Sequence, residues 1–133
     1  TQRVACTVTG SPTARQRTGR TGESIAVAYA RSRGWIVVET NARPPYGEID
    51  LVVRDGDIVV LIEVRTRRSD AFGTGSESLT QRKRIRMAAC AYEYLATLGL
   101  DPNATEWRVD LISIALAPGS APNVEHLPHV LAE

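Results

Sequence analysis

Three acidic residues flank a short Asp-Gly motif in the middle of the chain, and their spacing is the first sign of chemistry. Glu48 and Asp50 precede Asp55-Gly56, and Glu63 follows it. Asp-Gly between two alternating apolar runs predicts a two-residue β-hairpin turn. Opposed residues of an antiparallel pair project to the same side of the sheet, and this turn makes Glu48 face Glu63. The three carboxylates are therefore predicted to share one face of the hairpin.

The same register pairs Arg54 with Asp57 and Asp50 with Leu61. It divides the hairpin into a wholly apolar face, which must be core, and a mixed face that is half apolar and half acidic. The mixed face carries Glu48, Asp50, Val52, Val59, Leu61, Glu63 and Arg65.

Carboxylates opposed across a strand pair repel one another, so a cation, an arginine or a raised pKa must offset the repulsion. Mg²⁺ prefers oxygen ligands from one or two carboxylates, with water and substrate phosphate completing its shell. Asp50 and Glu63 match that ligand set. Surface ion pairs are the alternative, for instance Glu63 with Arg43 and Glu48 with Arg65. The residues alone do not decide between the two.

Capping residues and hydrophobic periodicity indicate the elements that position these side chains. Thr21 and Thr80 are candidate N-caps, and Glu23 suits the first turn of a helix, where a carboxylate complements the helix dipole. The predicted helices cover about 22–33 and 80–98, and the predicted strands cover 35–40, 48–54, 57–67, 106–116 and a short edge strand over 124–131. This order predicts an α/β fold with a mixed β-sheet flanked by helices.

A length of 133 residues suits one domain. Residues 1–20 are predicted to form a flexible basic tail and residues 21–133 a single domain. No stretch approaches the ~20 apolar residues of a membrane span, and the contexts of the two cysteines fit a reducing cytoplasm. His126 and His129 have a spacing that could fit zinc, but no third ligand lies near them in the sequence.

Basic residues gather between 65 and 86, although the net charge is only +1. Such a local excess favours phosphate binding, and a solvated helix face is the alternative interpretation. The predicted nucleic-acid contacts are Arg43, Tyr46, Arg67, Arg68, Arg82, Lys83 and Arg86.

Several short motifs together resemble a known family. They are Gly22-Glu23 at a helix start, Asn41-x-Arg43, Gly47-Glu48-Ile49-Asp50-Leu51, Glu63-Val64-Arg65-x-Arg67, Lys83 and Arg108-x-Asp110. Their order and spacing resemble the bacterial YraN family, an uncharacterised protein family (0102). That family is similar in turn to archaeal Holliday-junction resolvases and to the restriction-endonuclease-like superfamily.

The resemblance implies a restriction-endonuclease-like αβββαβ core with the PD-(D/E)xK arrangement. In this pattern Asp50 and Glu63 are the acidic members and hold Mg²⁺ or Mn²⁺, with the carbonyl of Val64 and with Glu23 assisting. Arg65 occupies the lysine position. The implied activity is endonucleolytic hydrolysis of DNA phosphodiesters, with branched DNA as one substrate, and the resolvase resemblance also allows a homodimer.

Arg65 departs from the implied pattern, because a guanidinium stays protonated and cannot act as a base. Lys83 is the only lysine of the chain and matches a lysine of the family pattern. We therefore hypothesise that Lys83 binds phosphate or assists the attacking water. The alternative function is a nucleic-acid-binding protein that keeps the nuclease fold but has weakened catalysis.

Overall fold

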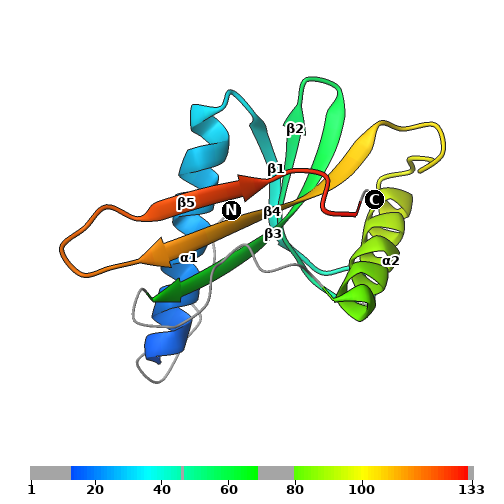
Figure 1. The fold of residues 1–133 in the computed structure, drawn as a ribbon. Coiled ribbons are helices and arrows are strands. Elements are labelled where there is room, and N and C mark those ends of the chain that lie inside the picture. The colour runs from blue at the N-terminus through cyan, green and yellow to red at the C-terminus, as the bar shows by residue number, and fades with distance from the viewer. Residues whose placement is uncertain (1–12, 46, 69–79, 132–133) are drawn as a thin grey trace, which may run out of the picture.

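A five-stranded mixed sheet forms the centre of the molecule, with its strands in the order β1-β2-β3-β4-β5. The computed structural model describes residues 13–45, 47–68 and 80–131 (Figure 1). Its elements are α1 (Ala14–Ser32), β1 (Ile36–Ala42), β2 (Ile49–Asp55), β3 (Ile58–Arg68), α2 (Gln81–Thr97), β4 (Trp107–Leu116) and β5 (Asn123–Leu127). Of the described strand pairs only β3 and β4 run parallel, and α2 lies between them in the chain, as a parallel connection requires. The predicted α/β class and element order are confirmed.

The two helices cover opposite faces of the sheet, as Figure 1 shows. Ala26 and Ala30 of α1 pack in one core cluster with Leu51 and Val53 of β2. On the other face, α2 packs against the sheet through buried residues at helical spacing. The α2 cluster includes Cys90, Ala91, Tyr94, Leu95, Val52, Val59, Leu61 and Val109. Neither helix, within the described parts of the chain, is long and apolar enough to cross a membrane.

The β2–β3 hairpin turns one residue later than the sequence predicted. Asp55 pairs with Ile58, so Gly56 and Asp57 form the turn and the predicted pairing of Arg54 with Asp57 is wrong. Gly56 has a φ of 63°, which suits the first central residue of a type II′ turn. The register shifts by two residues along β3, and a shift of two leaves every side chain on its predicted face.

Helix α1 begins earlier than predicted. Thr13, rather than Thr21, is the N-cap, and its side chain and that of Gln16 form a reciprocal capping box. Residues 14–20, assigned to the tail from the sequence, are therefore helical, whereas residues 1–12 lie outside the described residues. The cap of α2 is Thr80, as predicted, and β5 ends at Leu127, four residues short of the prediction.

A buried carboxylate ties the far edge of the sheet to α1. Asp110 of β4 is fully buried and accepts hydrogen bonds from Arg108 Nε at 3.0 Å and from the backbone N–H of His129 at 3.1 Å. His126 Nε2 lies 2.7 Å from Asp110, and its Nδ1 lies 3.1 Å from the Tyr29 hydroxyl of α1. His126 thus anchors β5 to both β4 and α1.

We expect Asp110→Ala to lower the free energy of unfolding by about 3–5 kcal/mol, because it leaves the partners of a buried carboxylate without an acceptor. Urea unfolding followed by circular dichroism measures the change. Asp57→Ala, in the exposed hairpin turn, is the matched control and is expected to change stability by less than about 0.5 kcal/mol. Equal effects of the two substitutions would contradict this account of Asp110.

Candidate functional site

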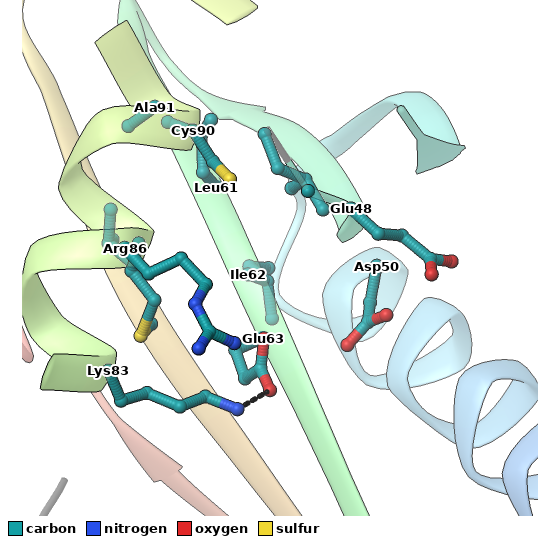
Figure 2. Close-up of a pocket in the computed structure, with 13 residues that line it drawn as sticks. Glu48, Asp50, Leu61, Ile62, Glu63, Lys83, Arg86, Cys90 and Ala91 are labelled. Atoms are coloured by element: carbon teal, nitrogen blue, oxygen red, sulfur yellow. Dashed lines mark ion pairs between the residues drawn. The ribbon is translucent and has the colours of Figure 1, made fainter. Parts of the chain in front are cut away.

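Asp50 and Glu63 face each other across the first residues of β2 and the middle of β3. Leu51 pairs with Ile62, and the antiparallel register carried one residue further sets Asp50 opposite Glu63. Both side chains reach the α2 side of the sheet (Figure 2). The predicted shared face is confirmed, whereas the predicted partner of Glu63 was Glu48, which is wrong because the turn lies one residue further on.

A pocket of about 400 Å³ lies between these carboxylates and α2. Its acidic side consists of Glu48, Asp50 and Glu63, and α2 supplies two cations, Lys83 and Arg86 (Figure 2). The rest of the lining is Gly47, Ile49, Leu61, Ile62, Met87, Cys90, Ala91 and Val109. The pocket therefore joins an apolar floor to a charged mouth that carries both signs.

Burial and neighbouring carboxylates act together on Asp50. Burial raises the pKa of Asp50 from 3.8 to about 6. The backbone N–H of Val64 donates a 2.8 Å hydrogen bond to Asp50 Oδ2 and lowers the pKa, while the charges of Glu63, Glu48 and Glu23 raise it further. Desolvation dominates, so ionised Asp50 is the form that this site destabilises.

Two ion pairs partly offset the acidic charge. Lys83 Nζ lies 3.1 Å from Glu63 Oε2, and Arg43 Nη2 lies 4.0 Å from Glu48 Oε2. The ion pairs considered from the sequence, Glu63 with Arg43 and Glu48 with Arg65, are not the ones formed. Arg43 and Glu48 are both largely exposed, so that pair contributes little. The Lys83 pair is less exposed and brings the only lysine of the chain to Glu63.

Glu23 approaches the site from the other face of the sheet. It lies on α1 and lines a second pocket of about 330 Å³ with Val64 and Thr66 of β3. The helix can come this close because residue 22 is glycine: a Cβ on Gly22 would lie 1.8 Å from Thr66 Oγ1. Glu23 is near enough for its charge to raise the pKa of Asp50, although it does not line the first pocket.

The remaining predicted site residues are dispersed. Arg65 lies on β3, paired in register with Ser113 of β4, and does not line either pocket. Arg82 is exposed in the first turn of α2, and Arg68 ends β3 at the second pocket. Arg67 precedes Arg68 on β3. Tyr46 lies outside the described residues.

The contribution of α2 residues to the floor of the pocket was not predicted from the sequence. Met87 and Cys90 line the pocket, and with Lys83 they lie at intervals of four and three residues. That spacing puts them on one side of a helix, so the periodicity that predicted α2 also held this signal. The periodicity did not show which strand residues lie opposite this side of α2.

The donor set suits a hard divalent cation. Among the described residues no group of three or more His, Cys, Asp or Glu side chains is placed to hold a metal ion. Magnesium sites, however, commonly use one or two carboxylates and complete the shell with water and phosphate oxygens. Asp50 and Glu63 provide two facing carboxylates, and burial makes ionised Asp50 costly in the absence of a cation. The residues present therefore fit such an ion.

Comparison with known proteins places the chain among close relatives. The model of the Uncharacterised protein family UPF0102 matches residues 22–114. A UPF0102 protein of Chloroflexus aurantiacus is 38% identical over 122 residues, which cover 92% of this chain and 98% of that protein. A UPF0102 protein of Dehalococcoides mccartyi is 37% identical, covering 90% of this chain and 96% of the relative, and one of Desulfitobacterium hafniense is 44% identical, covering 75% and 82%.

We expect Asp50→Asn to stabilise the metal-free protein at pH 8 and to have little such effect near pH 4. The pKa of Asp50 is raised from 3.8 to about 6, so the folded state binds the proton more tightly than the unfolded chain. Stability is therefore lost as pH rises between these two values, by on the order of 1–2 kcal/mol after allowing for solvent screening. Asparagine keeps an acceptor for the Val64 N–H without the charge.

Urea unfolding of both proteins at pH 4 and pH 8, in EDTA, measures this difference. Asp57→Asn in the exposed turn serves as the control for removing one carboxylate charge. A destabilising effect of Asp50→Asn at pH 8 would show that the carboxylate is not under electrostatic strain.

Proposed function

Since this chain belongs to the UPF0102 family, whose name assigns no activity, we propose its function from the site itself: a metal-dependent nuclease that hydrolyses phosphodiester bonds of nucleic acid, with DNA as the first substrate to test. The carrying observation is the facing pair of Asp50 and Glu63, with Asp50 desolvated beside an open pocket that also presents cations. Carboxylates alone would repel a phosphodiester. Two carboxylates with a divalent ion, next to Lys83 and Arg86, would attract one.

Four groups of the chain would act as oxygen ligands of the ion. Asp50 Oδ2 is engaged by the Val64 N–H, which leaves Oδ1 available as a ligand beside Glu63. The Val64 carbonyl and Glu23 are further oxygen donors near the pair. A bound Mg²⁺ or Mn²⁺ would supply Lewis-acid polarisation of a phosphoryl oxygen. In the overall reaction a water oxygen bonds to phosphorus, the ester P–O bond breaks, and the leaving oxygen takes a proton.

Lys83 gives the site a cation that can change partners. Its ammonium neutralises Glu63 at 3.1 Å when no other cation does. Once Glu63 serves as a ligand, Lys83 is free to turn to the phosphate, where it would hold the substrate and stabilise the charge that develops on it. Arg65 stays charged and cannot accept a proton from water, so its role is limited to electrostatic stabilisation. Arg86 extends from α2 into the same pocket (Figure 2).

We expect the purified protein to cleave end-labelled DNA in Mg²⁺ or Mn²⁺ and to lose this activity in EDTA. Asp50→Asn and Glu63→Gln should each reduce the cleavage rate by at least about a hundredfold, because each removes a charged ligand from a two-carboxylate site. Single-stranded, duplex, flapped and branched DNA compared in one gel assay identify the preferred substrate. Asp57→Asn should cleave like the parent.

The outcome of this assay separates the nuclease from its alternative. If none of these DNAs is cleaved in either metal, while binding persists and weakens with salt, the chain is a nucleic-acid-binding protein with the nuclease fold. Arg65 at the lysine position is the feature that favours this second candidate.

Lys83→Ala is expected to weaken DNA binding and to reduce cleavage, because it removes the ammonium that would contact phosphate. Lys83→Arg should restore most of the binding, since it keeps the charge, and less of the cleavage. Fluorescence anisotropy measures binding in Ca²⁺, and the gel assay measures cleavage in Mg²⁺. An alanine variant that binds and cleaves like the parent would limit Lys83 to neutralising Glu63.

A further inference from the structure

The second half of β3 has an edge that no strand covers in the described parts of the chain, and we call it the open edge. Strand β2 pairs with β3 only from Ile58 to Ile62, whereas β4 pairs with it from Val59 to Arg68. Beyond Ile62, on the edge of β3 that pairs with β2, no strand among the described residues pairs with Val64–Arg68. The longer strand therefore runs past its neighbour and leaves a row of backbone polar groups on that side.

The direction of these groups follows from two hydrogen bonds. The N–H of Val59 donates to the Glu106 carbonyl on the β4 side, at 3.0 Å, and the N–H of Val64 donates to Asp50 on the β2 side. Backbone groups alternate between the two edges along a strand. Thr66 and Arg68 therefore direct their N–H and C=O groups to the same edge as Val64, which is the open one.

Helix α1 covers the face of the sheet on which the side chains of Thr66 and Arg68 lie, and the second pocket lies between this helix and β3, beside the open edge. Ala14, Thr18 and Gly19 line it from α1, and the side chains of Thr66 and Arg68 belong to its β3 side. The small residues on α1 leave room beside the strand, while the contact of Gly22 with Thr66 keeps helix and strand together at the inner end. The result is a polar groove, which we call the α1–β3 groove.

The two ends of the α1–β3 groove carry opposite charges. Glu23 and Val64 lie at the inner end, next to Asp50, and Arg68 lies at the outer end. The four steps from Val64 to Arg68 extend about 13 Å at ~3.3 Å per residue. The backbone of an extended single strand spans more than the ~3.4 Å per nucleotide of the duplex rise, so this length accommodates fewer than four nucleotides. The end beside the carboxylates suits a cation, and the end beside the guanidinium suits a phosphate.

We propose that the α1–β3 groove binds the phosphodiester backbone of one nucleic-acid strand, next to the point where that strand meets Asp50 and Glu63. Arg68 holds a phosphate at the outer end, and the hydroxyls of Thr18 and Thr66 with the open N–H groups of β3 hydrogen-bond to the backbone oxygens. The identity of the ligand rests on the proposed function, whereas the groove itself rests on the β3 register. The strand crosses from the α1 side of the sheet to the α2 side at Asp50.

The test compares Arg68→Gln with a matched control, Arg31→Gln. Arg31 is an exposed arginine in the last turn of α1 and does not line the groove. Binding of a fluorescein-labelled single-stranded DNA oligonucleotide is followed by anisotropy in EDTA, over a series of salt concentrations. Arg68→Gln should raise Kd by roughly three- to tenfold and reduce the slope of log K against log salt by about 0.7, the loss of one phosphate contact on a single strand. Arg31→Gln should bind like the parent.

Thr66→Val tests the groove without changing its charge, because valine keeps the shape of threonine and lacks the hydroxyl. It should raise Kd at every salt concentration and leave the slope unchanged. In amide NMR spectra, the N–H signals of Thr66 and Arg68 should shift when the oligonucleotide is added.

Three results would overturn the proposal. They are parental affinity and slope in Arg68→Gln, equal losses in Arg68→Gln and Arg31→Gln, or shifts of the Thr66 and Arg68 signals with protein concentration alone, which would show that a peptide strand of a second copy pairs there. Catalysis is judged separately. A parent that cleaves DNA while Arg68→Gln binds normally refutes the groove alone, and an Arg68→Gln defect in a protein without cleavage refutes only the nuclease.

Discussion

The arrangement of this protein depends on one electrostatic constraint, the confinement of Asp50 and Glu63 opposite each other where the sheet meets α2. Burial raises the pKa of Asp50 to about 6, and three further carboxylates add to the cost of ionising it. The fold tolerates this cost because the opposite face of the paired segment of β2 and β3 is apolar, with Leu51, Val53 and Val60 in the α1 core. Ionised Asp50 therefore lowers the stability of the fold at neutral pH, although its Oδ2 accepts a hydrogen bond from the Val64 N–H. A carboxylate under such strain beside a pocket is a candidate functional group.

For β2 and β3, the sequence predicted correctly which face of the sheet each residue occupies, but not which residue lies opposite it on the neighbouring strand. Alternation along β2 and β3 has a period of two, so a turn placed one residue too early moved the register by two and left every side chain on its own face. Asp-Gly was correctly recognised as the turn signal, but Gly56 occupies the first central position instead of the second. As a result the shared face of Asp50 and Glu63 was predictable, and their direct opposition was not.

Contacts between elements that are far apart in the chain could not be predicted from the sequence. Lys83 was a candidate for the site, but its pairing with Glu63 depends on how α2 lies over β3. The start of α1 was missed because residues 14–20 are polar and lack an apolar stripe, and because both Thr13 and Thr21 could cap a helix. His126 was considered as a metal ligand, yet its partners Asp110 and Tyr29 come from two other elements. Tyr46 stays a prediction.

Unequal strand lengths explain why the carboxylates lie where they do. Strand β2 has 7 residues and β3 has 11, so the ladder between them must end partway along β3. The ladder ends at Leu51 and Ile62, and the next donor of β3 on that side, the N–H of Val64, donates to Asp50 Oδ2 at 2.8 Å. One carboxylate thus closes the ladder with one oxygen and faces the pocket with the other. Because Asp50 both caps the end of the β2–β3 ladder and lines the pocket, the open edge of β3 adjoins the acidic pair, and the ligand proposed for that edge would reach Asp50.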